Sequence, residues 1–225
     1  MTDRPILFSA PMVRAILAGT KTQTRRVVNV PPAAKPACQL YGPHEVIWDV
    51  PDCPGRITRV PYRVGGHLWV RETWAGADDM AGMGSDTEPP QCVAYRADET
   101  AVIFPSGELI PKPADTYAWN WTKLNWRPGI YMPRWASRIT LEVTGLRVER
   151  LQDISEADAY AEGVGTPSAV ALMRSVHGGS TQSADARVWF RSLWDSLNAK
   201  RAPWSSNPWV WVVEFKRITA AGSES

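Results

Sequence analysis

The chain has 225 residues, of which 44% are hydrophobic and 21% are charged, and these near-average values exclude a wholly disordered or fibrous protein. Its 25 basic and 23 acidic residues leave a net charge of +2, which is too small for binding nucleic acid by bulk electrostatics. Such a partner would need a local basic patch. The 19 prolines predict a loop-rich architecture with few long helices.

The cysteines and histidines do not form a metal-binding pattern. Cys38, Cys53 and Cys92 lack C-x-x-C spacing, so neither a disulfide framework nor a zinc site is predicted. We expect free thiols, no metal and no cofactor. The N-terminal residues lack a basic region followed by an apolar one, and no apolar run reaches the roughly 18 residues that would indicate a membrane span. These features predict a cytoplasmic protein with no membrane partner.

The first predicted elements are a helix and a strand. The helix runs from Ser9 to Gly19, because Ser9 suits the N-cap, apolar residues repeat at i,i+4 and Gly19 favours termination. The β-branched run Val27–Val30 predicts a strand that two prolines end. Residues 31–63 show no sustained period, and we interpret them as a long irregular insertion.

The middle of the chain predicts one strand and a second insertion. From Leu68 to Trp74 the residues alternate, with Leu68 and Val70 on one face and Trp69 and Arg71 on the other. Glu72 falls on the more apolar face. Residues 76–133 form the second predicted insertion, which includes a short strand near residues 92–96.

The last third of the chain has a regular pattern. Residues 137–151 read as strand with a break at Gly145, and a helix capped by Ser155 is predicted to close at Gly163. A second helix is predicted over residues 184–197, followed by an apolar strand over 209–215. The final residues, 220–225, read as a frayed tail.

This order of elements and motifs resembles the ASCH family, which has a PUA-like β-barrel fold. Four segments carry the resemblance: Ile16–Arg26, Val64–Trp74, Leu151–Val164 and Trp209–Phe215. The segment Met132–Arg138 is also similar to long, phage-associated members. The resemblance implies an α+β fold, a PUA-like barrel with peripheral helices. We expect a single domain over residues 1–219, elaborated by two long loop insertions at 31–63 and 76–133.

The resemblance also implies a function. It implies a nucleoside or RNA ligand and, for some small members, hydrolysis of the amide of 4-N-acetylcytidine by a lysine, a threonine three residues later and a glutamate. These residues correspond to Lys21, Thr24 and Glu162. Amide hydrolysis needs a nucleophile, a nearby base and an acid for the leaving amine. We predict Thr24 as the nucleophile, Lys21 as the base and Glu162 as the acid.

Two physical demands follow from this assignment. Lys21 can act as a base near neutral pH only if its pKa falls from about 10.4 toward about 7–8, through burial or the neighbouring Arg25 and Arg26. A regular strand would place residues 21 and 24 on opposite faces, so the pairing of Lys21 with Thr24 requires a bend after Gly19.

The remaining predicted site residues are substrate-binding: Arg25, Arg26, Glu72 and Arg134. Guanidinium groups bind phosphate and stack on bases. An equally good interpretation pairs the arginines, including Arg138, with glutamates such as Glu72, Glu142 or Glu162. If Glu162 is not the acid, Glu72 takes that role. Two alternative functions stay open, a non-catalytic module that binds single-stranded RNA and a ribonuclease.

Overall fold

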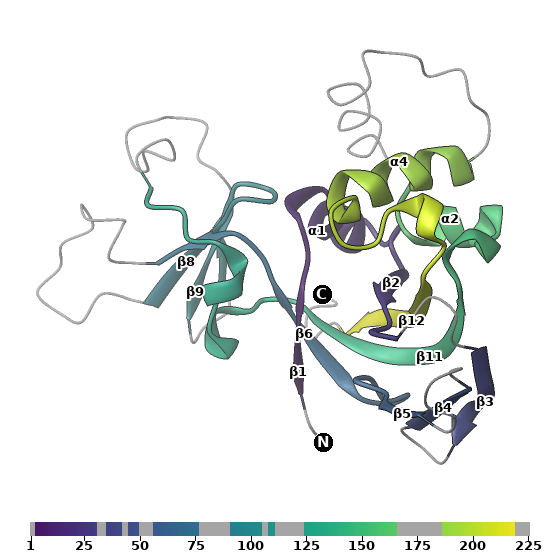
Figure 1. The fold of residues 1–225 in the computed structure, drawn as a ribbon. Coiled ribbons are helices and arrows are strands. Elements are labelled where there is room, and N and C mark those ends of the chain that lie inside the picture. Colours follow the sequence, from purple (N-terminus) through teal and green to yellow (C-terminus); the bar gives the residue numbers. More distant parts are fainter. Residues whose placement is uncertain are drawn as a thin grey trace, which may run out of the picture. The chain divides into compact units, whose positions relative to one another are not determined.

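The computed structural model describes residues 3–30, 35–41, 45–49, 56–76, 91–104, 108–110, 124–165 and 186–218. The fold is mixed α+β with few helices, as predicted (Figure 1). Its chain contacts define two compact units: unit 1 comprises Met1–Thr2, Ala15–His67 and Leu141–Ser225, and unit 2 comprises Asp3–Arg14 and Leu68–Thr140. Each unit is described by itself, and the single domain over residues 1–219 stays a prediction. The tail at 220–225 lies outside the described residues.

Three strands of unit 1 lie side by side in the order β11 (Thr140–Arg150), β12 (Trp209–Ile218) and β2 (Gln23–Val27). Strand β12 runs antiparallel to β2, with Val210 opposite Val27 and Glu214 opposite Gln23. The first predicted strand, at 27–30, is displaced: β2 begins four residues earlier and ends at Val27. Gln23, Thr24 and Arg25 are polar and do not predict a buried strand, but tertiary packing buries all three.

Strand β11 continues through Gly145, where the sequence predicts a break. A Cβ at this position would overlap a carboxylate oxygen of Glu214. The glycine therefore permits the close approach of a neighbouring side chain inside a continuous strand.

The helices α2 (Glu156–Ala161) and α4 (Ala186–Asn198) lie on the same side of β2 in unit 1 (Figure 1). Helix α2 begins as predicted, because the Ser155 hydroxyl accepts a hydrogen bond from the Asp158 amide at 3.0 Å. Gly163 follows its end at a φ of +86°, in the left-handed region that favours glycine. Short 3-10 turns, η4 (Leu151–Asp153) and η5 (Trp204–Ser206), precede α2 and β12.

The core of this part of unit 1 joins the two helices to strand β12. Phe190 and Trp194 of α4 pack with Val210 and Val212 of β12 and with Ala159 of α2. Burial of such large side chains is the main stabilising term in a domain of this size. It holds α2 against β2, and this packing positions the polar residues described below.

The predicted irregular insertion at 31–63 is wrong in one respect, because it contains a three-stranded antiparallel sheet. Its strands in order are β3 (Lys35–Tyr41), β4 (Glu45–Asp49) and β5 (Arg56–Arg59). Prolines before and between these strands interrupt the alternation of apolar and polar residues that would predict them, and the strands form through backbone pairing with one another.

Unit 2 begins with β1 (Arg4–Leu7), which pairs in parallel with β6 (His67–Arg71). The 3-10 turns η2 (Gly129–Tyr131) and η3 (Arg134–Ala136) belong to the same unit. Helix α1 (Ala10–Leu17) crosses the sequence boundary between the units and confirms the first predicted helix.

The second predicted insertion also contains a sheet. Four antiparallel strands follow in the order β10 (Glu108–Ile110), β9 (Thr100–Phe104), β8 (Gln91–Tyr95) and β7 (Trp74–Ala75). The predicted strand near 92–96 corresponds to β8, and its partners were not predicted. Cys92 of β8 is a free, buried thiol. Among the described strands no closed barrel is present, so the PUA-like barrel stays a prediction.

Candidate functional site

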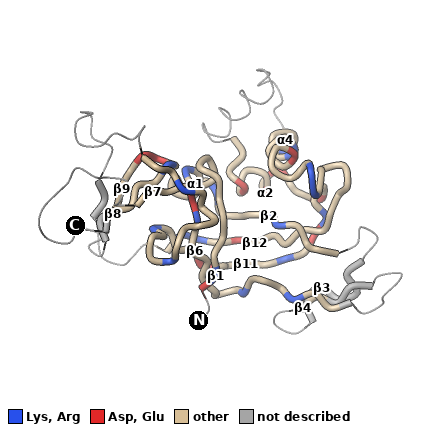
Figure 2. Tube along the Cα trace, turned by 60° about the vertical axis from the view of Figure 1, so that its left-hand side comes forward, with Lys and Arg blue, Asp and Glu red and all other residues tan. Residues whose placement is uncertain are grey.

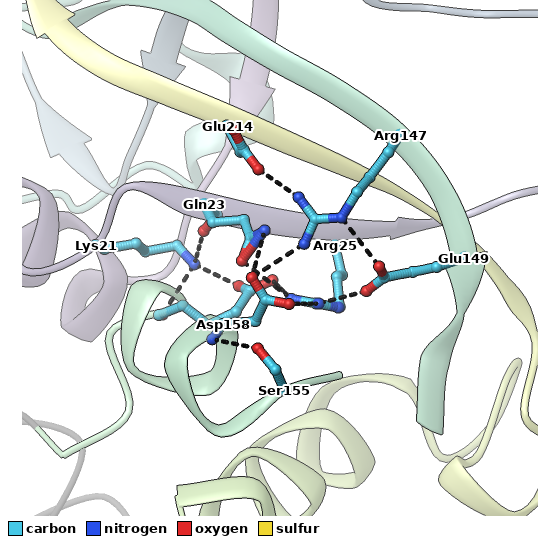
Figure 3. A network of polar contacts seen from close by, with 9 residues as sticks. Lys21, Gln23, Arg25, Arg147, Glu149, Ser155, Asp158 and Glu214 are labelled. Atoms are coloured by element: carbon cyan, nitrogen blue, oxygen red, sulfur yellow. Dashed lines mark hydrogen bonds and ion pairs between the residues drawn. The ribbon is translucent and has the colours of Figure 1, made fainter. Parts of the chain in front are cut away.

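The Lys21 side chain lies at one end of a buried polar cluster in unit 1 (Figure 3). Helix α1 ends at Leu17, Gly19 then turns the chain at a φ of +73°, and the Lys21 amide donates to the Ala15 carbonyl at 3.1 Å. Lys21 then forms an isolated antiparallel bridge with Glu162, the residue that follows α2. The two predicted site residues are therefore in contact although 141 positions separate them.

The Lys21 ammonium group has three acceptors within hydrogen-bonding distance. Nζ lies 2.7 Å from Glu162 Oε2, 2.9 Å from the Glu162 carbonyl oxygen and 2.8 Å from the Gln23 carbonyl oxygen. An ammonium group has three protons, so these contacts satisfy all of them. The side chain of Lys21 is wholly buried, and that of Glu162 is 4% exposed.

Arg25 is the second buried cation of the cluster. Its Nη1 lies 3.3 Å from Glu162 Oε1, so Glu162 accepts from both Lys21 and Arg25. Its Nη2 lies 2.5 Å from Glu149 Oε1 and 3.3 Å from Asp158 Oδ2. Arg25 also stacks over Phe190, with 5.7 Å from Cζ to the ring centroid. The contacts of Arg25 are therefore those of an ion-pairing residue, which is the alternative interpretation given by the sequence.

Arg147 completes the cluster from the side of β11. Its guanidinium donates to Glu149 and Asp158, each at 3.0 Å, and also pairs with Glu214 of β12. Figure 2 marks basic and acidic positions on both β11 and β12. We call the full set the Lys21 network: Lys21, Gln23, Arg25, Arg147, Glu149, Asp158, Glu162 and Glu214. Three basic and four acidic side chains give it a formal charge of −1.

Burial changes the proton affinity of the network. Desolvation lowers the pKa of Lys21 below its ordinary value of 10.5 despite the opposing charge of Glu162, and the charges of Arg26 and Arg25 lower the pKa further. The lowered pKa of Lys21 has the direction that a role as a base requires. Burial raises the pKa of Asp158, but the charge of Arg147 and the Ser155 hydrogen bond outweigh it, and the pKa stays below 3.8.

Thr24 lies between two network residues on the same strand. Gln23 and Arg25 both reach Asp158, so they share one face of β2. Because side chains alternate along a strand, Thr24 and Arg26 belong to the opposite face. The bend after Gly19 comes before Lys21, and the chain from Lys21 onward is extended. The arrangement joins Lys21 to Glu162 and does not join Thr24 to this pair.

The other two predicted site residues, Glu72 and Arg134, lie in unit 2 and have partners there. Glu72 is buried and accepts two hydrogen bonds from Arg138, each of 3.0 Å. Burial raises the pKa of Glu72, and Arg138 opposes the rise. Arg138 also contacts Asp98, so this pairing follows the ion-pair interpretation. Arg134 is exposed and pairs with Asp3 at 3.0 Å.

Four carboxyl and amide groups of the network were not predicted: Gln23, Glu149, Asp158 and Glu214. Spacing offers a signal for two of them. Asp158 precedes Glu162 by four residues, which is one helical turn, and Glu149 follows Arg147 by two residues, which is the strand period. Glu214 is found only through the register of β12 against β2.

The described residues include no group of histidine, cysteine and carboxylate side chains that could hold a metal ion. Within the same residues, no helix has the length and apolarity that crossing a bilayer requires. No family model, curated protein or solved structure matches the chain.

Proposed function

We propose that the chain is a hydrolase of the ASCH type with a PUA-like barrel, and that it removes the acetyl group from 4-N-acetylcytidine or a related modified nucleoside. The observation that supports this proposal is the buried contact between Lys21 and Glu162 at 2.7 Å. The ASCH resemblance assigns both residues to amide hydrolysis. Their contact gives that assignment a chemical basis.

The Lys21 and Glu162 pair can supply both a base and an acid by moving one proton. Transfer of a proton from Nζ to Oε2 converts the ion pair into a neutral amine and a carboxylic acid. Burial favours this neutral form, because a low dielectric disfavours separated charges. Lys21 then has a lone pair for a proton of water, and Glu162 has a proton for a departing amine.

The proposed reaction uses water as the nucleophile. Lys21 takes a proton from water while the water oxygen bonds to the acetyl carbonyl carbon. The tetrahedral intermediate then loses its C–N bond as Glu162 protonates the cytidine nitrogen, which releases acetic acid and cytidine. Lys21 and Glu162 end as the ion pair. This route replaces the predicted Thr24 nucleophile, because alternation along β2 turns Thr24 away from the pair.

The charge of the network favours a neutral substrate group over a phosphate. The guanidinium groups of Arg25 and Arg147 bind carboxylates, and the formal charge of the network is −1. A phosphate at this position would have to displace these carboxylates and would meet net repulsion. An acetylated cytosine base is uncharged, so it avoids both costs.

The proposal is tested by incubating the purified full chain with 4-N-acetylcytidine and measuring cytidine and acetate by chromatography. We expect turnover by the parent, loss of turnover in Glu162→Gln with much less loss of nucleoside binding, and loss in Lys21→Met. Lys216→Met is the matched control, because Lys216 pairs with Glu142 at 3.1 Å on the surface of the same unit. Absence of turnover in the parent would contradict the proposal.

Thr24→Val separates the two possible nucleophiles. Retained turnover supports attack by water, whereas loss of turnover together with an acetylated Thr24 in the parent, detected by mass spectrometry, would restore the threonine mechanism.

Wholly buried Lys21 and Arg25 side chains also fit a non-catalytic module, in which the network only stabilises the fold. That function predicts binding of single-stranded RNA without turnover, and cleavage of the RNA would instead indicate the ribonuclease.

A further inference from the structure

The Glu162 carboxylate lies between two buried cations, and each cation contacts a different oxygen. Lys21 Nζ lies 2.7 Å from Oε2, and Arg25 Nη1 lies 3.3 Å from Oε1. The side chains of Lys21 and Arg25 are wholly buried, and that of Glu162 is 4% exposed. A guanidinium keeps its charge, whereas a buried ammonium can lose a proton. Lys21 is therefore the cation that can become neutral, and Arg25 is a fixed charge on the other side of Glu162.

Arg25 is held in this position by contacts at both ends of its guanidinium (Figure 3). While Nη1 contacts Glu162, Nη2 lies 2.5 Å from Glu149 Oε1 and 3.3 Å from Asp158 Oδ2. Rotation of the planar group would break contacts at both ends at once. The guanidinium therefore keeps Oε1 of Glu162 on its own side, which leaves Oε2 for Lys21.

The charge of Arg25 acts on both members of the Lys21–Glu162 pair. Burial is the largest cause of the lowered pKa of Lys21, and the charges of Arg26 and Arg25 add to the lowering. At the other end, a positive charge 3.3 Å from Oε1 stabilises the negative charge that Glu162 gains when it gives up a proton. Arg25 thus favours the loss of a proton from either group.

Glu149 determines how much of the Arg25 charge acts on the pair. One oxygen of Glu149 contacts Arg25, and the other accepts from Arg147 Nε at 3.0 Å. The Glu149 side chain is 18% exposed, whereas that of Arg25 is wholly buried, so the carboxylate contacts Arg25 from the more exposed side of the network. It partly neutralises the guanidinium. Removal of this carboxylate would leave more of the Arg25 charge to act on Lys21 and Glu162.

We propose that Arg25 is a positioning residue that fixes Glu162 for Lys21 and, together with Glu149, controls how tightly the pair holds its proton. The effect on turnover rests on the proposed hydrolase function, but the control of the proton does not. Arg25 is singled out because it contacts the Glu162 carboxylate directly. The other charged groups around the pair are Arg26 of β2, Asp158 of α2, Arg147 of β11 and Glu214 of β12.

The test follows the ¹³Cε signal of Lys21 by NMR during a pH titration of the isotope-labelled full chain, with the signal assigned through bonds from the backbone. Arg25→Gln should move the midpoint of this titration to higher pH, because a positive charge is lost. Glu149→Gln should move the midpoint to lower pH, because a negative charge is lost. Arg25→Lys keeps the charge and should stay closer to the parent than Arg25→Gln. Loss of packing alone does not produce opposite shifts in the two variants.

Matched controls come from the exposed surface of the same unit. Glu156→Gln removes an exposed carboxylate in the first turn of α2, and Arg191→Gln removes an exposed guanidinium on α4. Each makes the same charge change as its test variant, and in both the Lys21 midpoint should equal that of the parent. Circular dichroism checks that every variant is folded. If Arg25→Gln does not fold, the partly exposed Glu149 provides the deciding variant.

Turnover of 4-N-acetylcytidine separates this inference from the proposed function. The proposed mechanism needs one proton on the pair, so the fall of kcat/KM at high pH should shift in each variant as the NMR midpoint does. Arg25→Gln should also lower kcat at least about 100-fold, the loss typical for removal of one preorganised group that stabilises developing charge. NMR shifts of the expected sign in a parent without turnover would support the control of the proton and contradict the hydrolase.

Two outcomes of the titration would overturn the inference. The first is a Lys21 midpoint that moves in the same direction, or not at all, in Arg25→Gln and Glu149→Gln; where only Glu149→Gln folds, an unmoved or raised midpoint has the same meaning. The second is a shift of equal size in the controls Glu156→Gln and Arg191→Gln.

Discussion

Replacing Lys21 by methionine should destabilise the protein far more than replacing a surface lysine. The side chain of Lys21 is wholly buried and contacts Glu162 at 2.7 Å, and removal of one partner from a buried pair costs about 3–5 kcal/mol. The change also leaves two backbone carbonyls without this donor. Arg25, 3.3 Å from the other Glu162 oxygen, continues to neutralise the carboxylate and keeps the cost within that range.

Lys216→Met is the matched control for this measurement. Lys216 is 64% exposed and pairs with Glu142, so its loss should change stability by about 0–1 kcal/mol. Glu162→Gln should fall between the two, since the amide oxygen can still accept from Lys21. Urea unfolding followed by circular dichroism gives the free energies at constant m-value. A Lys21→Met variant within about 1 kcal/mol of the parent would refute the argument that breaking this buried pair costs several times more than breaking a surface pair.

The pH dependence of the same variant has a defined sign. Because the native pKa of Lys21 is below 10.5, the native state binds this proton less tightly than the unfolded chain. The proton-linked contribution of Lys21 to stability therefore rises as pH increases from the lowered pKa toward 10.5. The stability difference between parent and Lys21→Met should grow over this window, and a difference that shrinks would contradict the lowered pKa.

Three further predictions concern stability. Trp194→Phe should cost about 1–3 kcal/mol in urea unfolding, because the Trp194 Nε1 donates to a buried carbonyl at 2.7 Å and the variant leaves that carbonyl unpaired. Gly129→Ala should cost about 1–3 kcal/mol, because its Cβ would lie 2.8 Å from a methyl group of Leu7 and 2.9 Å from the backbone of Glu72. Gly76→Ala is the tolerated control, because the nearest atom to its Cβ would be 3.5 Å away. Burial raises the pKa of Asp98, but Arg138 outweighs this effect and holds the pKa below 3.8, so the stability that Asp98 contributes is lost as pH falls below 3.8. Asp98→Asn should therefore reduce the loss of stability below this pH, measured as the unfolding midpoint at a series of pH values.

Local signals predicted the helices of unit 1 well, because caps and glycines act within a few residues. Ser155 and Gly163 mark the ends of α2 in the sequence, and their hydrogen bond and positive φ are present. Except for β8, the strands of both insertions were missed for the opposite reason. Their pairing partners are brought together by long-range contacts, and short strands interrupted by proline have no clear period of two.

The residues of the candidate site likewise divide into those that a local sequence pattern can place and those that only long-range contacts bring together. The contact of Lys21 with Glu162 spans 141 positions and was reached only through the family resemblance, since no local pattern connects these residues. The position of Thr24 was accessible from strand period alone, which already placed it opposite Lys21 unless the chain bends. The ion pairs of Arg25 and Arg138 could not be ranked against phosphate binding in the sequence, because the choice depends on which carboxylates the fold brings within reach.

Exposure changes steadily across the Lys21 network, and the change bears on how a buried pair could meet a substrate. Lys21 is wholly buried, Asp158 is 24% exposed, and Glu214 at the outer end is 46% exposed. Breaking an ion pair at the exposed end costs about 0–1 kcal/mol, whereas removing one partner of the buried Lys21–Glu162 pair costs about 3–5 kcal/mol. The proposed hydrolysis would therefore have the substrate enter at the exposed end, where breaking an Arg147 ion pair costs little, while Lys21 and Glu162 keep their contact. The buried end of the network, which holds α2 in place, is also where the proposed function locates the proton transfer between Lys21 and Glu162.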